Sequence, residues 1–237
     1  MSLHHNPRMV TSGIELHLDA ADRMSYPGSG TTWYDLSGNG RHLTLVNGPV
    51  PSDKYFSFDG TGDYAERTSV GLSLSSFTID TVVRPTSNPG SYRAFFSATE
   101  ASLNDYEYGI NWDMGPNSSA AFIDINVEIS RAYGGFFNRD VKTSSTPFGT
   151  WAHLAIVVDH ISDTYTQYVN GVAEYSSTYS GTITYFDRIR VGARYYSGGT
   201  QGTFFPGDIA KSTLYNRALT AAEVDQNYQV FRQRFGI

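Results

Sequence analysis

The chain has 237 residues, of which 17 are basic and 23 are acidic, so its formal net charge is -6. No cluster of Lys and Arg residues stands out, so nucleic-acid binding driven by phosphate neutralisation is not expected. The absence of cysteine excludes a disulfide scaffold, a thiolate zinc site and a cysteine nucleophile.

Aromatic residues make up 14% of the chain, mostly as 17 Tyr and 14 Phe, and there are 23 Gly. Aromatic side chains pack well on pleated surfaces, and glycine suits tight turns, so this composition favours a protein of many short strands. The opening "MSLHHNPRMVTSG" contains no apolar core of a secretory signal, and no run of about 18 apolar residues could span a membrane. We therefore expect synthesis in a cytoplasm without a signal peptide, and no membrane insertion.

In chain order, residues 1–12 are polar and are interpreted as an N-terminal arm, and residues 13–237 as one domain. From Gly13 onward, short alternating or apolar segments are separated by turn signals, as in "IELHLDA", "FTIDTVVRP" and "TWAHLAIVVD". "YTQYVNGVAEY" centres on Asn170-Gly171, the strongest short hairpin signal. These segments predict an all-β protein built as an antiparallel two-sheet sandwich.

The end of the chain predicts a helix over residues 220–234. Thr220 and Glu223 have the spacing of a capping box. Val224, Tyr228 and Phe231 then share one helical face. We expect this helix to cover an edge or an end of the sandwich, or to pack against a partner chain.

Seven segments occur in an order that resembles the laminin-G-like, concanavalin A-like jelly-roll family. They are "GIELHLDAAD", "WYDLSGNGRHLTLVNGP", "FSFDGTGDY", "FTIDTVVRPTS", "WAHLAIVVD", "YVNGVAEY" and "GDIAKSTLYNRALTAAEV". Each is a weak signal alone, but the ordered set is specific and covers about residues 13–230. The resemblance implies a concanavalin A-like jelly-roll sandwich, closed by the short C-terminal α-helix.

The opening "HHNPRMVTSGIELHLDAADRMSYPGSGTTWYDLSGNG" and the ending "RFGI" are similar to a subset of that family found among structural proteins of tailed bacteriophages. This resemblance implies a non-catalytic virion protein, serving in capsid decoration, a head fibre or a tail fibre. Its implied partners are other virion proteins, further copies of itself in a homo-oligomer, and a cell-surface glycan. A free carbohydrate-binding lectin-like module is the alternative.

A glycoside hydrolase is disfavoured. Retaining enzymes need two carboxyl groups about 5–5.5 Å apart. In "FIDINVEIS", Asp124 and Glu128 share a strand face but lie roughly 13 Å apart at strand rise, and Asn126 separates them. Phe122 stands where the fold family's glucanases carry their first glutamate. A solvent-facing polar stripe is the simpler interpretation.

A Ser-His-Asp site is the other catalytic option. Asp35, Ser37 and His42 lie close together in "WYDLSGNGRH", but no Gly-x-Ser-x-Gly elbow occurs. The two glycines favour a turn, with Trp33 as a buried anchor and Asp35 and Asn39 as its braces. We therefore expect no enzyme activity.

Calcium is the metal that the sequence suggests, because loop carboxylates and backbone carbonyls are its usual ligands. "DGTGD" places Asp59 and Asp63 on a tight glycine loop, and the resemblance adds Asp208 of "PGDIAK" as a late ligand. Lys211 departs from the pattern, since relatives often carry a second acid after the isoleucine. Whether these aspartates hold a structural calcium or only cap turns stays open at this point.

A glycan site needs exposed aromatic rings that stack on sugars. The candidates are Tyr106, Tyr108 and Trp112 in "NDYEYGINWDMGPN", and Tyr195 and Tyr196 in the glycine-rich "ARYYSGGTQGTFF". Core packing and subunit contacts are alternative roles for such residues.

Overall fold

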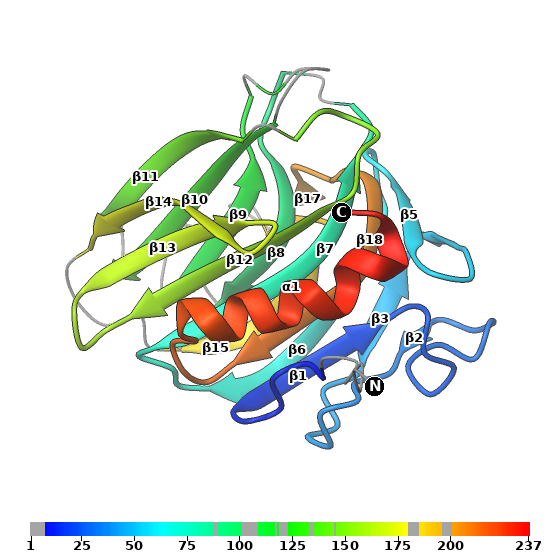
Figure 1. Cartoon of the computed structure of the whole chain (residues 1–237). Coiled ribbons are helices and arrows are strands. Elements are labelled where there is room, and N and C mark those ends of the chain that lie inside the picture. The colour runs from blue at the N-terminus through cyan, green and yellow to red at the C-terminus, as the bar shows by residue number, and fades with distance from the viewer. Residues whose placement is uncertain are drawn as a thin grey trace, which may run out of the picture.

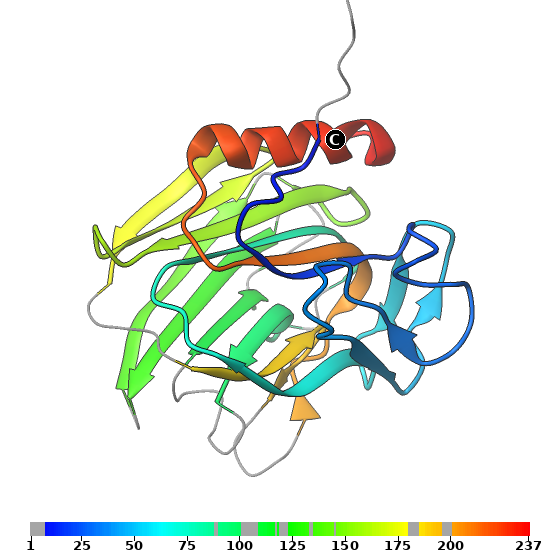
Figure 2. The same cartoon turned by 90° about the horizontal axis from the view of Figure 1, so that it is seen from below.

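The computed structural model describes residues 8–87, 90–100, 109–116, 118, 123–132, 135–144, 146–179, 185–195 and 201–237. Three layers are stacked: the helix α1, an eight-stranded sheet beneath it, here called sheet A, and a second eight-stranded sheet, called sheet B (Figures 1 and 2). All strand pairs are antiparallel.

Sheet A has the strand order β14-β13-β12-β7-β18-β5-β4, and β1 also pairs with β18. Its strands are β1 (Ile14–Asp19), β4 (Val50–Pro51), β5 (Phe56–Asp59), β7 (Phe77–Pro85), β12 (Ala152–Asp159), β13 (Thr164–Val169), β14 (Val172–Thr178) and β18 (Pro206–Tyr215). The first and last strands of the chain thus meet near the middle of one sheet.

Sheet B has the strand order β11-β10-β9-β8-β15-β6-β3-β2. Its strands are β2 (Thr32–Trp33), β3 (Leu43–Val46), β6 (Tyr64–Leu72), β8 (Arg93–Thr99), β9 (Gly109–Met114), β10 (Ile123–Ala132), β11 (Gly135–Ser144) and β15 (Phe186–Val191). A separate two-stranded ribbon pairs β16 (Arg194–Tyr195) with β17 (Gln201–Gly202).

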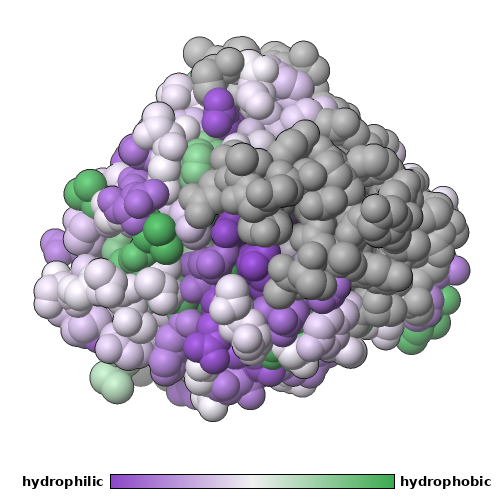
Figure 3. Space-filling view, turned by 180° about the vertical axis from the view of Figure 1, so that it is seen from behind, coloured by the Kyte–Doolittle hydropathy of each residue, from purple (hydrophilic) through white to green (hydrophobic). Residues whose placement is uncertain are grey.

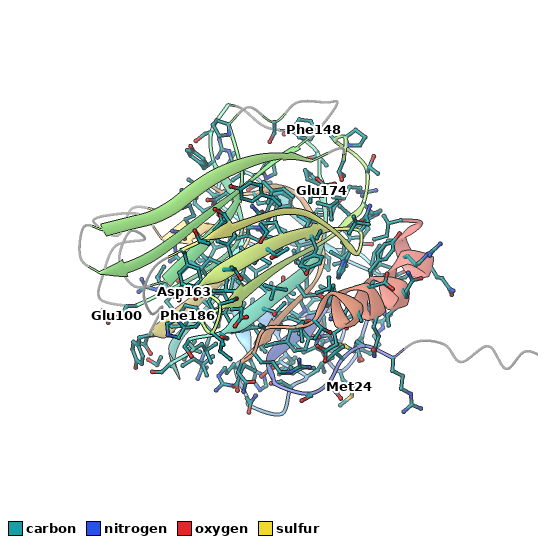
Figure 4. All side chains as sticks on the ribbon, turned by 60° about the vertical axis from the view of Figure 1, so that its left-hand side comes forward. Met24, Glu100, Phe148, Asp163, Glu174 and Phe186 are labelled. Atoms are coloured by element: carbon teal, nitrogen blue, oxygen red, sulfur yellow. The ribbon has the colours of Figure 1, made fainter. Side chains whose placement is uncertain are left out.

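The hydrophobic core fills the space between the two sheets, as the side chains in Figure 4 show. Regular strands such as β15 contribute alternate residues, here Ile189 and Val191, since side chains one residue apart point to opposite faces. Trp33 is fully buried there and meets the Phe56 ring edge-on, with 4.8 Å between ring centroids. The prediction of a buried anchor at Trp33 is confirmed.

The helix α1 (Ala221–Phe235) lies on the outer face of sheet A, whereas the sequence analysis expected it at an edge or an end. The Thr220 side chain accepts a hydrogen bond from the Glu223 N–H, and the Glu223 carboxylate accepts one from the Thr220 N–H, which completes the predicted capping box. Gly236 ends the helix with a φ of 72°, in the left-handed region that glycine tolerates. The predicted fold class, a mostly β two-sheet jelly roll with one C-terminal helix, is confirmed.

Residues 8–12, the described part of the predicted arm, pack against the helix. The Val10 N–H donates to Asn227 Oδ1 at 2.8 Å, and the Val10 carbonyl accepts from the Tyr215 hydroxyl at 3.0 Å. Gln226 Nε2 donates to the Arg8 carbonyl at 2.6 Å. In the part of the chain that the structure describes, no helix has the length and apolar character needed to cross a membrane.

Candidate functional site

The loop "WYDLSGNGRH" is held together by the buried carboxylate of Asp35. This carboxylate accepts hydrogen bonds from the backbone N–H groups of His17 (2.9 Å) and Ser37 (2.9 Å). It also accepts the Arg41 N–H at 3.0 Å and the Ser37 hydroxyl at 2.7 Å. The Asp35 N–H in turn donates to His42 Nδ1 at 3.0 Å. Asp, Ser and His of this run are therefore all used in bracing the turn.

The outer face of sheet B carries charged side chains that the sequence analysis did not single out. On β15, Ile189 and Val191 point into the core, so the alternating residues Arg188 and Arg190 point to the outer face. On β9, Ile110 and Met114 are likewise fully buried in the core. Asn111 and Asp113 therefore share the outer face with the arginines.

Strand register lines these polar residues up across the sheet. Arg190 is paired with Glu66 on one side and with Ser97 on the other. Ser97 is paired with Asn111, and Glu128 of β10 is the next register position beyond Asn111. One transverse row thus crosses β6, β15, β8, β9 and β10.

Ion pairs fix the charged groups of this face. Arg190 Nε lies 2.5 Å from Glu66 Oε2, and Arg188 Nε lies 3.4 Å from the same oxygen. Arg194 Nη1 lies 3.6 Å from Asp113 Oδ2. The set Glu66, Ser97, Asn111, Asp113, Arg188, Arg190 and Arg194 is called the arginine face below.

The side chains of the arginine face differ in their exposure to solvent. The side chains of Glu66 and Arg188 are 21% and 14% exposed, whereas those of Arg190 and Arg194 are only 4% and 3% exposed. The Arg190 guanidinium lies 4.7 Å from the centre of the Tyr64 ring. Seen from the side of sheet B, hydrophilic residues gather on the surface between the grey region and the rim (Figure 3).

Such a face presents hydrogen-bond donors and acceptors in fixed positions. The Arg188 guanidinium offers donors in a planar fork and the Glu66 carboxylate offers acceptors. A ligand rich in hydroxyl groups needs this mixture. Ser97, Asn111 and Asp113 are buried, and Asn111 Oδ1 accepts the Ser97 hydroxyl at 2.6 Å. The sequence signal was present in "DRIRV", where two arginines alternate with core residues, but it was interpreted only as a strand.

Trp112 was predicted to be an exposed ring for sugar stacking, and this prediction is wrong. Its side chain is fully buried between the sheets, where it meets the Phe95 ring edge-on at 5.8 Å. Trp112 Nε1 donates to Gln167 Oε1 across the core at 3.3 Å. Trp112 alternates with Asn111 and Asp113 along β9, so placing those polar groups outward places the indole inward.

The other predicted ligand-binding residues cannot be placed in the same way. Tyr106, Tyr108 and Tyr196 lie outside the described residues. The backbone of Tyr195 pairs with Gln201 in the ribbon β16–β17.

Asp59 and Asp63, two of the predicted calcium ligands, are engaged by groups of their own loop. Asp59 accepts the N–H groups of Thr61 (2.8 Å) and Gly62 (2.9 Å), and the Thr61 hydroxyl at 2.5 Å. Burial opposes ionisation of Asp59, but these hydrogen bonds outweigh it and lower its pKa to about 2. Burial and the neighbouring charge of Asp59 raise the pKa of Asp63.

Asp208, the third predicted ligand, faces an arginine. Its Oδ2 lies 2.6 Å from Arg84 Nη2, and its Oδ1 accepts the Ser57 hydroxyl at 2.5 Å. Within the described ranges, no three His, Asp or Glu side chains are grouped as a metal site would require. The three carboxylates therefore do not fit a calcium site in this arrangement. Calcium binding stays a prediction, which a melting curve in CaCl₂ against EDTA would test.

The strand considered for hydrolase chemistry is β10, and its core side is formed by Ile125 and Val127. Along the sequence of β10, Asp124, Asn126 and Glu128 alternate with these two residues, and the solvent-facing polar stripe stays a prediction. The backbone of Asn126 is paired with Asp113, and that of Glu128 with Asn111, so β10 adjoins the arginine face.

A second polar cluster lies on the outer face of sheet A, sealed beneath α1. Asp80 of β7 contacts Lys211 Nζ through Oδ1, and both side chains are fully buried. Asp80 Oδ2 accepts from Asn227 Nδ2 at 2.8 Å and lies 3.1 Å from His153 Nε2. Asn227 Nδ2 also lies 3.0 Å from the Tyr215 hydroxyl oxygen. Lys211, which departs from the family pattern, thus serves an ion pair.

Burial changes the pKa values of the ionisable groups in this cluster. It lowers the pKa of Lys211. It opposes ionisation of Asp80, but Lys211 and His153 outweigh it and hold the pKa of Asp80 below its ordinary range. Nearby, burial of the His17 imidazole lowers its pKa to about 4, and His17 Nδ1 lies 2.9 Å from Thr213 Oγ1.

A family model described as the concanavalin A-like lectin/glucanases superfamily, Laminin_G_3, matches residues 59–225. No curated protein matches the chain. The family match fits the order of the sequence motifs, because the matched range contains most of the strands and the start of α1.

Several solved structures share the fold at low identity. The binding domain of botulinum neurotoxin serotype G superposes with a TM-score of 0.68 at 16% identity, covering 92% of this chain and 51% of that chain. The chain therefore spans about half the length of the neurotoxin domain.

A SAP-like pentraxin from Limulus polyphemus gives a TM-score of 0.57 at 16% identity, covering 71% of this chain and 78% of the pentraxin. The CBM40 module of a Ruminococcus gnavus sialidase, bound to α2,3-sialyllactose, gives 0.54 at 16% identity, with coverages of 64% and 81%. These likenesses show the jelly-roll fold.

Proposed function

Because the chain belongs to the Laminin_G_3 family of the concanavalin A-like lectin/glucanase superfamily, we propose that it is a non-catalytic glycan-binding module. Its binding surface is the arginine face of sheet B. Glycan hydroxyls accept hydrogen bonds from the Arg188 guanidinium and donate them to the Glu66 carboxylate.

The partly exposed ion pair of Glu66 with Arg188, next to the buried Arg190 of the transverse row, is the observation that carries this proposal. The row consists of side chains on neighbouring strands, and sites built on strands hold their geometry better than sites on loops. Ion pairing of Arg190 and Arg188 with Glu66 orients the guanidinium groups before a ligand arrives. Preorganisation of this kind lowers the entropic cost of binding.

The absence of catalysis is proposed from the same groups. Each carboxylate described on the arginine face, Glu66 and Asp113, has an arginine as a partner. Along β10, Asp124 and Glu128 are four residues apart, which is too far for the carboxyl pair of either glycosidase class.

Arg188 offers the sharpest test, because it belongs to the arginine face and remains partly exposed. The purified protein is screened on a glycan array that includes α2,3-sialyllactose, the ligand bound to the Ruminococcus gnavus module. For any glycan that binds, Arg188→Ala should weaken binding by at least about tenfold, since a hydrogen bond to a charged group contributes about 1.5–3 kcal/mol.

Arg232→Ala is the matched control, since Arg232 is an exposed arginine on α1, at the opposite side of the sandwich. It should bind as the unchanged chain does. If no glycan binds even at high protein concentration, or if both variants bind equally well, the arginine face is not a glycan site.

A second proposal concerns where the module is used. The similarity of the two chain ends to tailed-phage structural proteins favours display on a virion surface, as a capsid-decoration or fibre subunit and as a homo-oligomer. Mass spectrometry of purified particles tests the location, and light scattering of the isolated chain tests the oligomeric state. Absence of the chain from intact particles would remove the virion role while leaving the glycan proposal standing.

A further inference from the structure

The pair Lys211–Asp80 under α1 has an unusual setting for two charged groups. Lys211 is paired with Val82 across the β18–β7 ladder, and Asp80 is paired with Thr213, so the two side chains are diagonal neighbours on one face. Both are 0% exposed. Isolating two charges from water costs several kcal/mol per ion, so this burial demands strong compensation.

The compensation around Lys211 is incomplete. A lysine ammonium has three N–H donors. Among the residues that the structure describes, the contacts of Lys211 Nζ are Asp80 Oδ1 and the face of the Phe231 ring, whose centre lies 4.6 Å away. Asp80 Oδ2, by contrast, has donors from both Asn227 and His153. The buried Lys211 Nζ thus has more N–H donors than acceptors around it, while the Asp80 carboxylate has several donors.

We propose that Lys211 Nζ and Asp80 Cγ become joined by an intramolecular amide bond once the chain has folded. The inference is independent of the proposed glycan binding, because the cluster lies on the other sheet. It assigns a covalent modification that uses only groups of this chain.

The reaction is a condensation without any change of oxidation state. The ammonium passes one proton to Asp80 Oδ1, which gives a neutral amine and a neutral carboxylic acid. The nitrogen lone pair attacks Cγ and forms the C–N bond. The Cγ–Oδ1 bond then breaks, and Oδ1 leaves as water with two of the three ammonium hydrogens. One hydrogen remains on the amide nitrogen.

The surroundings favour the neutral amine and the attack on Cγ, and the proton transfer to Asp80, whose pKa Lys211 and His153 hold low, is the costly step. A site sealed from bulk solvent disfavours charge, and burial lowers the pKa of Lys211, which favours the neutral, nucleophilic amine. Asn227 Nδ2 and His153 Nε2 both face Asp80 Oδ2, where negative charge develops in the tetrahedral intermediate. The packed strands hold nitrogen and carboxyl in contact, which removes the entropic cost of bringing them together.

The product also satisfies the buried polar groups better than the ion pair does. Oδ2 becomes an amide carbonyl and keeps its two donors, and the nitrogen keeps a single N–H in place of three. Two full charges disappear from a site sealed from bulk solvent. Buried polar groups are costly mainly when they lack partners, so the amide is the better match to this cavity.

Intact-mass spectrometry under denaturing conditions tests the bond directly. The folded and then denatured chain should be lighter than its sequence by the mass of one water. A tryptic digest should contain a branched peptide that carries both Asp80 and Lys211, uncleaved after Lys211. If the chain has the full mass of its sequence after prolonged incubation in the folded state, the proposal is wrong.

Two lysine variants provide a matched comparison. Lys211→Met should have the full mass, whereas Lys54→Met, at an exposed lysine, should still lack one water. The two variants have the same elemental composition, so their masses can be compared without any correction. Equal masses for the two variants would overturn the proposal, whether or not Lys211→Met folds.

A missing water could also come from a succinimide at Asp59-Gly60 in the glycine loop. Hydroxylamine cleaves a succinimide and leaves an ordinary amide intact. Loss of the mass difference on this treatment, or mapping of it to residues 59–60, would count against the Lys211–Asp80 bond.

Discussion

The outer faces of the two sheets carry similar charged residues but differ in their exposure to solvent. On sheet A, the charged pair Asp80–Lys211 is covered by α1, and its further partners His153 and Asn227 belong to the chain itself. On sheet B, Glu66 and Arg188 form an ion pair that keeps part of its surface open to solvent. The same chemistry is thus sealed from solvent on one side and partly open to solvent on the other.

This difference shows that alternation alone does not tell whether the outward-facing polar residues of a strand are structural or free to bind a ligand. Asp80 on β7 and Arg190 on β15 both alternate with core residues. Only the element packed over each face separates a structural cluster from a binding surface. The two faces can therefore be told apart by stability on one side and ligand affinity on the other.

Asp80→Ala should have the largest effect on stability. It leaves the buried Lys211 charge without its carboxylate and removes an acceptor from Asn227, which should cost about 3–5 kcal/mol of unfolding free energy. Urea denaturation measures this loss. The exposed Asp53→Ala should stay within about 0.5 kcal/mol of the unchanged chain. A small effect of Asp80→Ala would mean that the covered face is not structural.

Lowering the pH should reduce the free energy of unfolding through protonation of His17, which lies near the covered outer face of sheet A. Its pKa in the folded state is about 4, below the ordinary 6.5, because burial disfavours the imidazolium. The unfolded chain thus binds a proton more readily, so stability is constant above pH 6.5 and falls between pH 6.5 and 4, by about 3 kcal/mol in total.

His17→Asn can keep a hydrogen-bonding group near Thr213 while removing the titration. Urea midpoints measured across pH 6.5 to 4.5 should be flatter for this variant than for the unchanged chain. The range ends at 4.5 because the carboxyl of Glu223, whose pKa is lowered to about 2 chiefly by its hydrogen bond with Arg217, begins to matter below it. Parallel curves for the two proteins would contradict the role of His17.

Asp35→Ala should cost about 1–3 kcal/mol, because it leaves buried N–H groups of the 33–42 turn without an acceptor. Thermal melts and urea titrations measure the change. Affinity for any glycan that binds the arginine face should be unchanged. A loss of affinity in a folded Asp35→Ala protein would instead connect this loop to binding.

Thr220→Ala should have the smallest effect, about 1 kcal/mol, through loss of the side-chain cap at the start of α1. Thr220→Ser retains the hydroxyl and should recover most of that loss. Because α1 covers the polar cluster, hydrogen exchange at Asn227 should accelerate in the alanine variant only. Equal exchange in both variants would mean that the cap does not govern opening of this face.

Local patterns predicted local structure well. The capping box at Thr220 and the turn at Asp35 depend on residues close in sequence, and both are confirmed. The prediction of an exposed Trp112 was wrong because the alternation along β9 was not considered. Ile110 and Met114, two residues to either side, are apolar and share the core-facing side with Trp112. The Asp80–Lys211 pair could not be anticipated, since 131 positions separate its members and only the β7–β18 pairing joins them.

The position of the two chain ends sets how this molecule can be attached to anything larger. Arg8 lies against α1 through Gln226, and the chain finishes just beyond the same helix, so both described ends emerge on the side of sheet A (Figure 2). A tether at either end would hold the molecule by the side that carries α1, and the arginine face would then point away from the attachment. The two described chain ends and the proposed binding surface thus lie on opposite sides of the sandwich.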